Sequence, residues 1–490
     1  MDYFAPVDEM LFQLEHICNI TELQSYNKYE NFDINTIKTI LDEAARLSSQ
    51  TIAPLNRLGD LTHPKIEGDD VQCPSAFFKA YKEISSGGWV GMSGDQGFGG
   101  MELPLVVASC VNEMLGSACL SLALNPLMTQ GQIEALQAHA SDEIKKCYLP
   151  QLISGRWSGT MNLTEEGAGS DVGALTTSAI PNDDGSYEIS GQKIYISWGE
   201  HNLTENICHL VLARLPGSQN GTRGISLFLV PKFLPNADGQ IGERNNLMML
   251  ALEKKMGLHG SPTAVMEYRQ AKGWLVGKPN EGMSAMFTMM NNARLGVAVQ
   301  GLSQAERALQ KSIRHSKERK QGRSQIENGT GAIIDHADVR RNLLNMKALT
   351  NVSRSLCLDT AMSIDLAKES GSSVQMNRAA FLIPIAKAFS TDNGCRVSDI
   401  GIQVHGGLGF IESSGVPQLY RDVRITAIYE GTNGIQGMDL VNRKLSDGGT
   451  IGFSLIEEFM HTKQICNELG IIKNESMKEF GSAIRHLSKA

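Results

Sequence analysis

The sequence predicts an α+β protein in which two helical regions flank a smaller β region. Apolar residues recur at helical spacing from about residue 35 to residue 155, and again for about 160 residues after Gly282. Between these regions the chain changes to short runs rich in Val, Ile, Leu and Tyr, such as SYEISGQKIYIS and ICHLVLARL, which turn residues separate. These changes of period predict a helical domain, a β domain and a second helical domain, in that order.

The domain limits follow from the same changes of pattern. We expect an N-terminal extension over residues 1–34, a helical domain over 35–158, a central β domain over 159–282, a C-terminal helical bundle over 283–446 and a C-terminal tail over 447–490. Long helical patterns joined by brief polar linkers favour the bundle. Within it, the run MSAMFTMMNNA carries methionine at helical spacing and is expected to fill the core.

Composition and charge argue against several classes of protein. The 490 residues carry a net charge of −8 and a pI near 5.8, whereas a nucleic-acid-binding domain usually has a basic face. The nine cysteines are scattered singly, without a CxxC pair or metal-ligand spacing, as is typical of a reducing compartment. The acidic N-terminus does not resemble a signal or transit peptide, and no run of about 18 apolar residues predicts a membrane span. We therefore expect a cytoplasmic protein without a metal, a nucleic-acid partner or a membrane span.

The most specific local motif is LTEEGAGSDVGA, which extends from Leu163 to Ala174. Its glycines allow the main chain to approach a flat ligand closely, and Thr164 and Ser170 offer hydroxyl groups for hydrogen bonds. A plain Gly-rich hydrophilic turn is the alternative interpretation of this segment taken alone. The sequence contains no GxGxxG between a strand and a helix and no GxxxxGK[ST], which disfavours a Rossmann-type nicotinamide site and a P-loop.

This motif resembles the first signature of the acyl-CoA dehydrogenase family, and further segments extend the resemblance. In QKIYISWG, Tyr195 and Ser197 stand where the family's KxWITNG pattern has a tryptophan and a threonine beside the flavin. The resemblance implies that Tyr195 stacks on the isoalloxazine ring of FAD and that Ser197 hydrogen-bonds near its reactive nitrogen. It also implies that Thr164 and Ser170 contact FAD, and that Ser170 contacts the substrate.

Two further segments resemble the parts of the family that bind the phosphates of FAD. HSKERKQGR resembles YAxxRxxFG and places Arg319 where the family has an arginine that reaches the pyrophosphate of a neighbouring subunit's FAD. IQVHGGLGF resembles QxxGGxGY, with Gln403, Gly406 and Gly407 matching, and its glycines allow main-chain N–H groups to meet phosphate oxygens. The resemblance therefore implies a homodimer or a dimer of dimers.

The segment RDVRITAIYEGTNGIQG carries the expected catalytic base. Glu430 directly follows the apolar run ITAIY, and burial raises the pKa of a carboxylate and strengthens it as a base. The resemblance assigns Glu430 as the base and Thr432 as a flavin contact, and Tyr429 is expected to line the acyl slot. Arg294, in NNARLG, matches a family arginine near the CoA end of the substrate, and an arginine on a helix surface is the alternative interpretation.

The resemblance covers about residues 35–445 and implies the acyl-CoA dehydrogenase fold, with a central β-barrel-like domain and a C-terminal four-helix bundle. It implies FAD-dependent dehydrogenation of an acyl-CoA thioester to a trans-2-enoyl-CoA. In this reaction Glu430 takes the α-proton and FAD takes the β-hydride. Electron-transfer flavoprotein is the expected electron acceptor. The alternatives are an acyl-CoA oxidase and an FAD-binding relative with a non-catalytic binding or repair role.

The segments YFAPVDEMLFQLEHI and SGGWVGMSGDQGFGGMELP resemble one extended branch of the family, which includes 3-methylmercaptopropionyl-CoA dehydrogenase. Members of that branch usually continue into an extra C-terminal helical domain, and we expect most of this domain to be missing here. The expected substrate is a short to medium acyl-CoA or an acyl-CoA that contains a thioether.

Overall fold

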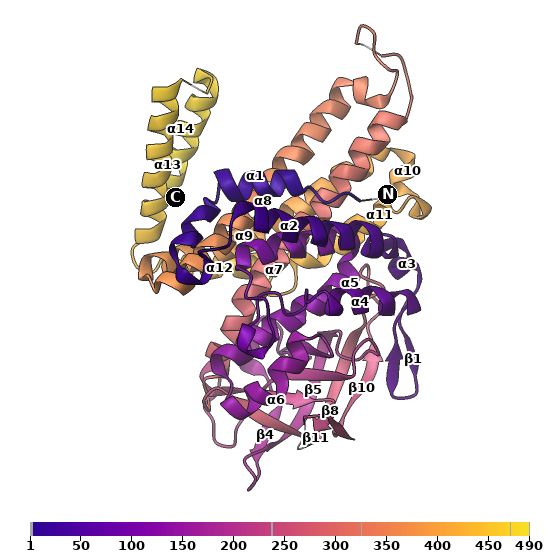
Figure 1. Ribbon diagram of the computed structural model, residues 1–490, viewed down its shortest axis with the longest axis vertical. Coiled ribbons are helices and arrows are strands. Elements are labelled where there is room, and N and C mark those ends of the chain that lie inside the picture. Colours follow the sequence, from indigo (N-terminus) through magenta and orange to yellow (C-terminus); the bar gives the residue numbers. More distant parts are fainter. Residues whose placement is uncertain (1–2, 237–238, 325, 471, 490) are drawn as a thin grey trace.

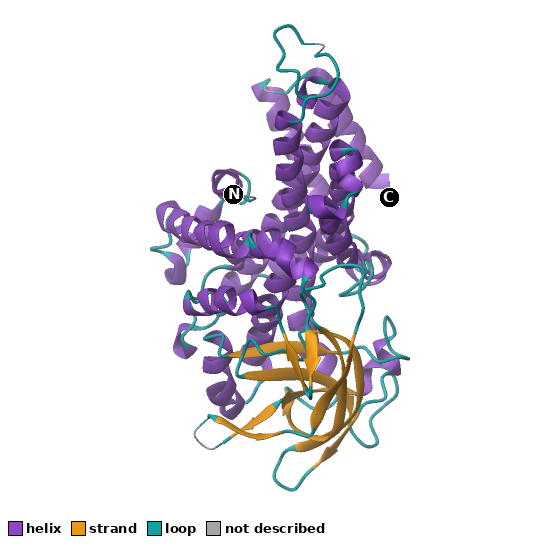
Figure 2. Cartoon of the chain, turned by 90° about the vertical axis from the view of Figure 1, so that its right-hand side faces the viewer, coloured by secondary structure: helices purple, strands orange, loops and turns teal. Residues whose placement is uncertain are grey.

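The computed structural model describes residues 3–236, 239–324, 326–470 and 472–489. Its elements follow the expected order, with helices towards both ends of the chain and most strands between them (Figure 1). The strands gather at one end of the elongated molecule, and long helices extend from them towards the other end (Figure 2). The α+β fold class expected from the periodicity is therefore confirmed.

Residues 3–153 are mainly helical. Their elements are α1 (Val7–His16), α2 (Ile34–Arg46), α3 (Leu55–Leu61), α4 (Ser75–Ser86), α5 (Leu105–His139) and α6 (Asp142–Ile153), with a small hairpin of β1 (Lys65–Glu67) and β2 (Asp70–Gln72). α2 begins after Asp33, whose carboxylate accepts a hydrogen bond from the Thr36 N–H at 2.7 Å. Its buried residues Ile37 and Leu41 recur at helical spacing and face the core.

The long helix α5 is buried between the helical and the strand-rich parts of the molecule. By length and composition it could cross a membrane, but 89% of its most apolar window is buried inside the protein. It packs against the long helix of residues 282–318 and against the strand of residues 157–162. The backbone is extended at Cys119 (φ −157°, ψ 96°), so the helix is kinked at this residue. α5 is therefore a core helix that both halves of the fold share.

The β domain is a seven-stranded sheet that closes on itself. Its strands are β3 (Trp157–Asn162), β4 (Ser178–Pro181), β5 (Tyr187–Ser197), β6 (Asn206–Arg214), β7 (Ile225–Pro231), β10 (Leu247–Leu252) and β11 (Thr263–Val276), and β8 (Phe233–Pro235) pairs separately with β9 (Ile241–Arg244). Antiparallel pairs join β4 to β5, β5 to β11, β11 to β7 and β7 to β6. A single parallel bridge from Arg214 to Ser178 returns from β6 to β4, which closes a barrel-like ring.

The C-terminal region is a bundle of long helices. It comprises α7 (Gly282–Glu318), α8 (Ala337–Ser370) and α9 (Ser373–His405), followed by the shorter α10 (Gly407–Phe410), α11 (Val416–Val423) and α12 (Asn433–Asp439). α7, α8 and α9 pack on one another, and α5 packs on α7 and α8. The fully buried Arg354 of α8 donates hydrogen bonds of 2.6 Å to Glu113 of α5 and to Glu306 of α7. This charged triad links three of the four long helices.

The residues expected to form a tail contain a helical hairpin. α13 (Thr450–Leu469) and α14 (Asn474–Lys489) pack on each other, and α13 also contacts α9. The hairpin stands beside the bundle, at the upper left in Figure 1, away from the β domain. It therefore takes no part in the cavity that lies between the bundle and the β domain.

Candidate active site

A cavity of about 950 Å³ lies where the β domain meets the helical bundle. Most of its lining residues belong to five segments that are far apart in the sequence: 163–172, 194–197, 253–258, 283–294 and 421–435. Of the residues singled out from the sequence, eight line this one cavity, namely Thr164, Ser170, Tyr195, Ser197, Arg294, Tyr429, Glu430 and Thr432. The fold thus gathers most of the predicted site residues around a single space.

Glu430 lies in the cavity wall on a loop with an unusual backbone. Its φ is +57° and that of Gly431 is +80°, so two successive residues adopt left-handed conformations. For a glutamate this conformation costs about 1–3 kcal/mol, and surrounding contacts must hold it. Among the residues that the structure describes, none accepts a hydrogen bond from the Glu430 main-chain N–H. The loop therefore presents both a carboxylate and a free main-chain donor.

The environment of Glu430 favours a carboxylate that can accept a proton. Burial raises the pKa of Glu430 to about 7, while the positive charges of Arg294 and Lys387 act in the opposite direction. The side chain is only partly covered by protein, because it faces the cavity. A base with a pKa near the working pH combines a useful ionised fraction with a useful proton affinity.

Several side chains hold the loop of Glu430 in place. The buried Gln436 of α12 donates hydrogen bonds of 3.1 Å to the carbonyl oxygens of Glu430 and of Gly431. Thr432 caps α12, because its hydroxyl accepts a hydrogen bond from the Ile435 N–H at 3.3 Å. The Tyr429 hydroxyl donates to Oε1 of Gln300 on α7. The loop is therefore tied to α12 on one side and to α7 on the other.

The Gly-rich segment is anchored by a buried ion pair beneath it. The Glu165 carboxylate accepts hydrogen bonds from the main chain and hydroxyls of Thr176 and Thr177, and from Nζ of Lys193 at 2.8 Å. Burial alone would raise the pKa of Glu165, but the charge of Lys193 and these hydrogen bonds lower it to about 2. The ion pair fixes the start of the segment, so that its exposed part, which includes Ser170, borders the cavity.

Strand β5 carries a bulge where it borders the cavity. Ala264 of β11 pairs with Ile196 and Met266 pairs with Lys193, so β5 has one extra residue between these pairs. Tyr195 lies in the bulge with φ +62°, and 60% of its surface is exposed. A bulge can redirect a side chain, and here it leaves the Tyr195 ring uncovered at the cavity.

Arg294 lies in the cavity wall but is already paired. It is 4% exposed, and its Nη1 donates to Oδ2 of Asp439 at 2.7 Å, while Arg443 holds the other oxygen of Asp439 at 2.6 Å. Its Nε has no hydrogen-bond partner among the described residues. Substrate binding by Arg294 stays a prediction. The helix-surface alternative does not describe this buried side chain.

Four predicted cofactor residues lie away from the cavity. Arg319 is exposed at the C-terminal end of α7, and Gln403, Gly406 and Gly407 are exposed where α9 ends. These two helix ends lie side by side, because the rings of His315 and His405 stack with centroids 4.3 Å apart. Within one chain, the four residues predicted to contact the phosphates of FAD therefore lie apart from the cavity.

The methionine run of α7 has two roles. Met286 and Met289 are fully buried in the core, as expected, but Met283 and Met290 line the cavity with Phe287. A flexible thioether side chain adapts to the shape of an apolar ligand. The expectation of core filling thus missed the face of α7 that borders the cavity.

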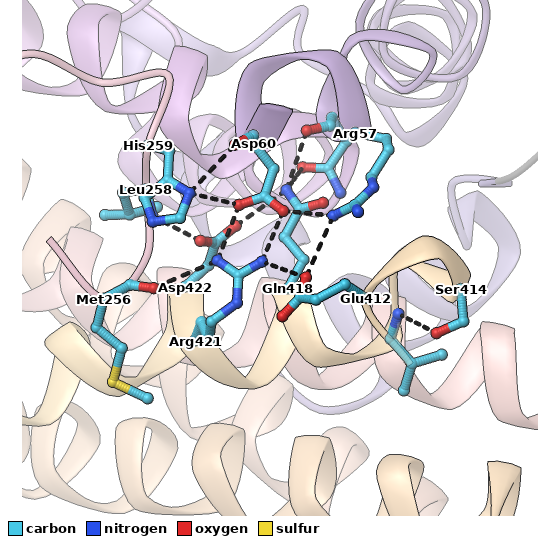
Figure 3. A network of polar contacts seen from close by, with 12 residues as sticks. Arg57, Asp60, Met256, Leu258, His259, Glu412, Ser414, Gln418, Arg421 and Asp422 are labelled. Carbon is cyan, nitrogen blue, oxygen red and sulfur yellow. Dashed lines mark hydrogen bonds and ion pairs between the residues drawn. The ribbon is translucent and has the colours of Figure 1, made fainter. Parts of the chain in front are cut away.

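A network of polar contacts borders the cavity on the side of α11 (Figure 3). At its centre, buried Asp60 of α3 accepts hydrogen bonds of 2.8 and 2.6 Å from the two terminal nitrogens of Arg421, and another from Arg57. His259 Nδ1 lies 2.9 Å from Oδ1 of Asp60. The network therefore joins the N-terminal helices to the loop after β10 and to α11.

Asp422 extends this network to the cavity wall. It is buried, and its carboxylate accepts hydrogen bonds from the Leu258 N–H at 2.6 Å and from Nε2 of Gln418 at 3.2 Å. Burial raises the pKa of Asp422 to about 6, although the Leu258 N–H lowers it. Because only a short 3-10 helix over Arg424–Ala427 separates α11 from the loop of Glu430, the network sets the position at which that segment starts.

Comparison with known proteins identifies the family. Three family models match consecutive parts of the chain: the N-terminal domain of acyl-CoA dehydrogenase over residues 37–156, the middle domain over 160–271 and the C-terminal domain over 280–445. The chain belongs to the acyl-CoA dehydrogenase family. The expectations of an enzyme of this family and of its fold are therefore confirmed.

Acyl-CoA dehydrogenases of several organisms are similar to the chain over most of its length. The 3-methylmercaptopropionyl-CoA dehydrogenase of Ruegeria pomeroyi is 45% identical, over 92% of this chain and 77% of that protein. The broad-specificity linear acyl-CoA dehydrogenase FadE5 of Mycobacterium tuberculosis is 32% identical, over 90% and 75%. The butyryl-CoA dehydrogenase structure from Megasphaera elsdenii has a TM-score of 0.70 and 24% identity, over 84% of this chain and 98% of that one.

Several side chains around the cavity were missed from the sequence. Lys387, Gln436 and Asp439 all contact Glu430, its loop or Arg294. Lys387 does leave a signal, since it is the only charged residue of the apolar run FLIPIAKAF. The two others lie among small and polar residues of α12, where nothing in the local pattern separates them from a surface helix.

Replacement of Asp60 by Asn should destabilise the fold. Arg421 would lose its bidentate partner in a partly buried site, and we expect the free energy of unfolding to fall by about 1–3 kcal/mol in urea titrations. The control is Lys38→Met, which removes an exposed ion pair with Asp42 and should leave the free energy of unfolding nearly unchanged. Equal losses in both variants would contradict a central role for Asp60.

Proposed function

We propose that this protein is an FAD-dependent acyl-CoA dehydrogenase that converts an acyl-CoA thioester to a trans-2-enoyl-CoA. The observation that carries the proposal is Glu430, a half-buried carboxylate of raised pKa in the wall of a cavity between the β domain and the bundle. Glu430 takes the α-proton of the acyl group. Bound FAD supplies the acceptor for the β-hydride.

The cavity fits the flavin end of FAD. No atom lies within 4 Å of the position that a Cβ atom at Gly169 would occupy, so the space beside this residue is open. The main chain at Gly169 can therefore approach a flat ring closely. Tyr195 offers an uncovered aromatic face, and the hydroxyls of Thr164, Ser170, Ser197 and Thr432 also border the space. These residues would hold the ring system and its polar edge.

The loop of Glu430 supplies two functions to the acyl thioester. The free main-chain N–H of Glu430 donates a hydrogen bond to the thioester oxygen, on which negative charge develops as the α-proton leaves. The carboxylate of the same residue accepts that proton. Since donor and base belong to one residue, their relative position depends on the backbone of the loop. An error of about 1 Å there could reduce the rate on the order of 100-fold.

We propose a short to medium acyl-CoA, or one that contains a thioether, as the substrate. The relative from Ruegeria pomeroyi, 45% identical, is a 3-methylmercaptopropionyl-CoA dehydrogenase. Support in this chain comes from the cavity wall, in which Met128, Met161, Met283, Met290 and Phe287 form an apolar surface. Tyr429 would lie along the acyl slot, and Arg294 near the CoA end.

Electron-transfer flavoprotein is the proposed acceptor of the electrons. One structure similar to this chain, with 26% identity and a TM-score of 0.71, was described in a study of the electron transferring flavoprotein of Acidaminococcus fermentans.

The alternative of a non-catalytic relative is less well supported, because such a protein would have no chemical need for a carboxylate at position 430. The nine cysteines are unpaired, which agrees with the proposed cytoplasmic location.

We further propose a homo-oligomer in which a second copy completes the FAD site. The exposed Arg319 would bind the pyrophosphate of a neighbouring subunit's FAD, and Gln403, Gly406 and Gly407 would bind near it. The proposal accounts for the separation of these residues from the cavity of their own chain.

Anaerobic mixing with a panel of acyl-CoAs tests the proposed activity. Substrates should bleach the flavin absorbance at about 450 nm, because reduced FAD loses this band. We expect the fastest bleaching with short to medium or thioether-containing acyl groups, and none with free CoA as the control. A protein that binds no FAD, or whose flavin no acyl-CoA reduces, would refute the proposed function.

Replacement of Glu430 by Gln should abolish proton removal and retain FAD. Bleaching should slow by at least about 100-fold, because an amide is not a base. In the unaltered protein the bleaching rate should rise with pH through about 7, since only the ionised form of Glu430 accepts the proton. Stopped-flow absorbance over a pH series measures both effects. Unchanged reduction in Glu430→Gln would place the base elsewhere.

Replacement of Arg319 by Gln should weaken FAD binding at least about tenfold, because a charged hydrogen bond to the pyrophosphate is lost. Equilibrium dialysis gives the affinity, and light scattering gives the oligomeric state. Lys317→Gln, an exposed residue near the same helix end, is the matched control and should bind FAD normally. A stable FAD-loaded monomer would contradict the proposed role of Arg319.

A further inference from the structure

A buried lysine lies against the loop that carries Glu430. Lys387, on α9, is 0% exposed, and its ammonium group donates hydrogen bonds to the carbonyl oxygen of Gly431 at 2.8 Å and to Oδ1 of Asn433 at 2.9 Å. Burial of an ammonium group is unfavourable unless hydrogen bonds and opposite charge compensate. An apolar side chain at position 387 would fill the same space without the free-energy cost of burying a charge.

The contacts of Lys387 tie the loop to α9. Asn433, which accepts from Lys387, donates through its own amide to the Thr391 hydroxyl at 3.0 Å and to Asp392 at 2.7 Å. Lys387 and Gln436 both donate to the carbonyl oxygen of Gly431. α9 and α12 therefore hold this peptide group together. This carbonyl belongs to the peptide group one residue beyond Glu430, and Gln436 also donates to the carbonyl oxygen of Glu430 itself, so these contacts together help to set the direction of the carboxylate.

The charges of Lys387 and Glu430 also influence each other. The positive charges of Arg294 and then of Lys387 act to lower the pKa of Glu430, against the effect of burial. Burial lowers the pKa of Lys387 to about 8, and the negative charge of Glu430 acts in the opposite direction. Each group thus favours the charged form of the other. In its ionised form Glu430 is the species that accepts a proton.

We infer that Lys387 is a positioning residue for Glu430, which holds the loop through the Gly431 carbonyl and favours the ionised carboxylate by its charge. The inference rests on the proposed function, because it requires Glu430 to act as the base. Lys387 acts through the main chain of the cavity wall and through its charge, and it does not itself line the cavity.

Lys387→Met tests the inference, with the rate of anaerobic flavin bleaching at saturating acyl-CoA as the readout. We expect the rate to fall on the order of 10- to 100-fold, because the loop loses a fixed contact. The rise of rate with pH should move to higher pH, because loss of a nearby positive charge raises the pKa of a carboxylate. FAD content and the substrate concentration at half-saturation should stay close to those of the unaltered protein.

Two variants separate the effect of Lys387 on the position of the loop from the effect of its charge on Glu430. Gln436→Met removes the other clamp on the loop without a change of charge, and should slow bleaching while its pH dependence stays in place. Lys387→Arg keeps the positive charge, and its pH dependence should return towards that of the unaltered protein. A merely structural role would not move the pH profile. An unchanged rate and an unchanged pH profile in Lys387→Met would overturn the inference.

The outcomes distinguish this inference from the proposed function. If no acyl-CoA bleaches the unaltered protein, the proposed function fails. If the unaltered protein and Lys387→Met bleach alike, only the inference about Lys387 fails. If Lys387→Met does not fold, Asn433→Leu decides, because it removes a partner of the ammonium group and keeps the lysine. Slower bleaching in Asn433→Leu supports the inference, and unchanged bleaching overturns it.

Discussion

The rest of the site depends on one half-buried carboxylate, that of Glu430, on a left-handed backbone. Glu430 must stay out of bulk water, which raises its pKa, and yet remain ionised often enough to accept a proton. Its loop must also hold two successive residues at positive φ. Both conditions are unfavourable locally, so contacts from α7, α9 and α12 have to stabilise them. The bundle supplies those contacts at fixed positions.

Buried charges connect the segments around the cavity. Glu165 with Lys193 holds the Gly-rich segment against β5, and Asp60 with Arg421 joins α3 to α11. Arg294 with Asp439 joins α7 to α12. Each pair links residues of different elements, and at least one of the two elements borders the cavity. Such pairs contribute little net stability by themselves, but a wrong arrangement would leave a buried charge unpaired, which disfavours alternative positions of these segments.

Much of the fold and part of the site could be predicted from the sequence. Periodicity located the helical and β regions, and short motifs brought Glu430 and Tyr195 to attention because their neighbours in the chain are distinctive. Partners from distant segments could not be found in this way. Asp439 lies 145 residues from Arg294, and Lys387 lies 44 residues from Gly431. Only the packing of α7, α9 and α12 brings these residues together, and local patterns do not encode that packing.

The bulge in β5 limits how this part of the chain can change in length. Ile189 and Ile196 belong to the same core cluster although they are seven residues apart, a separation that an unbroken strand would place on opposite faces. The extra residue at Tyr195 corrects the alternation. Deletion of any single residue between these two isoleucines would turn one part of the strand over and exchange core-facing for cavity-facing side chains. Evolution can therefore vary the residues of this stretch more readily than their number.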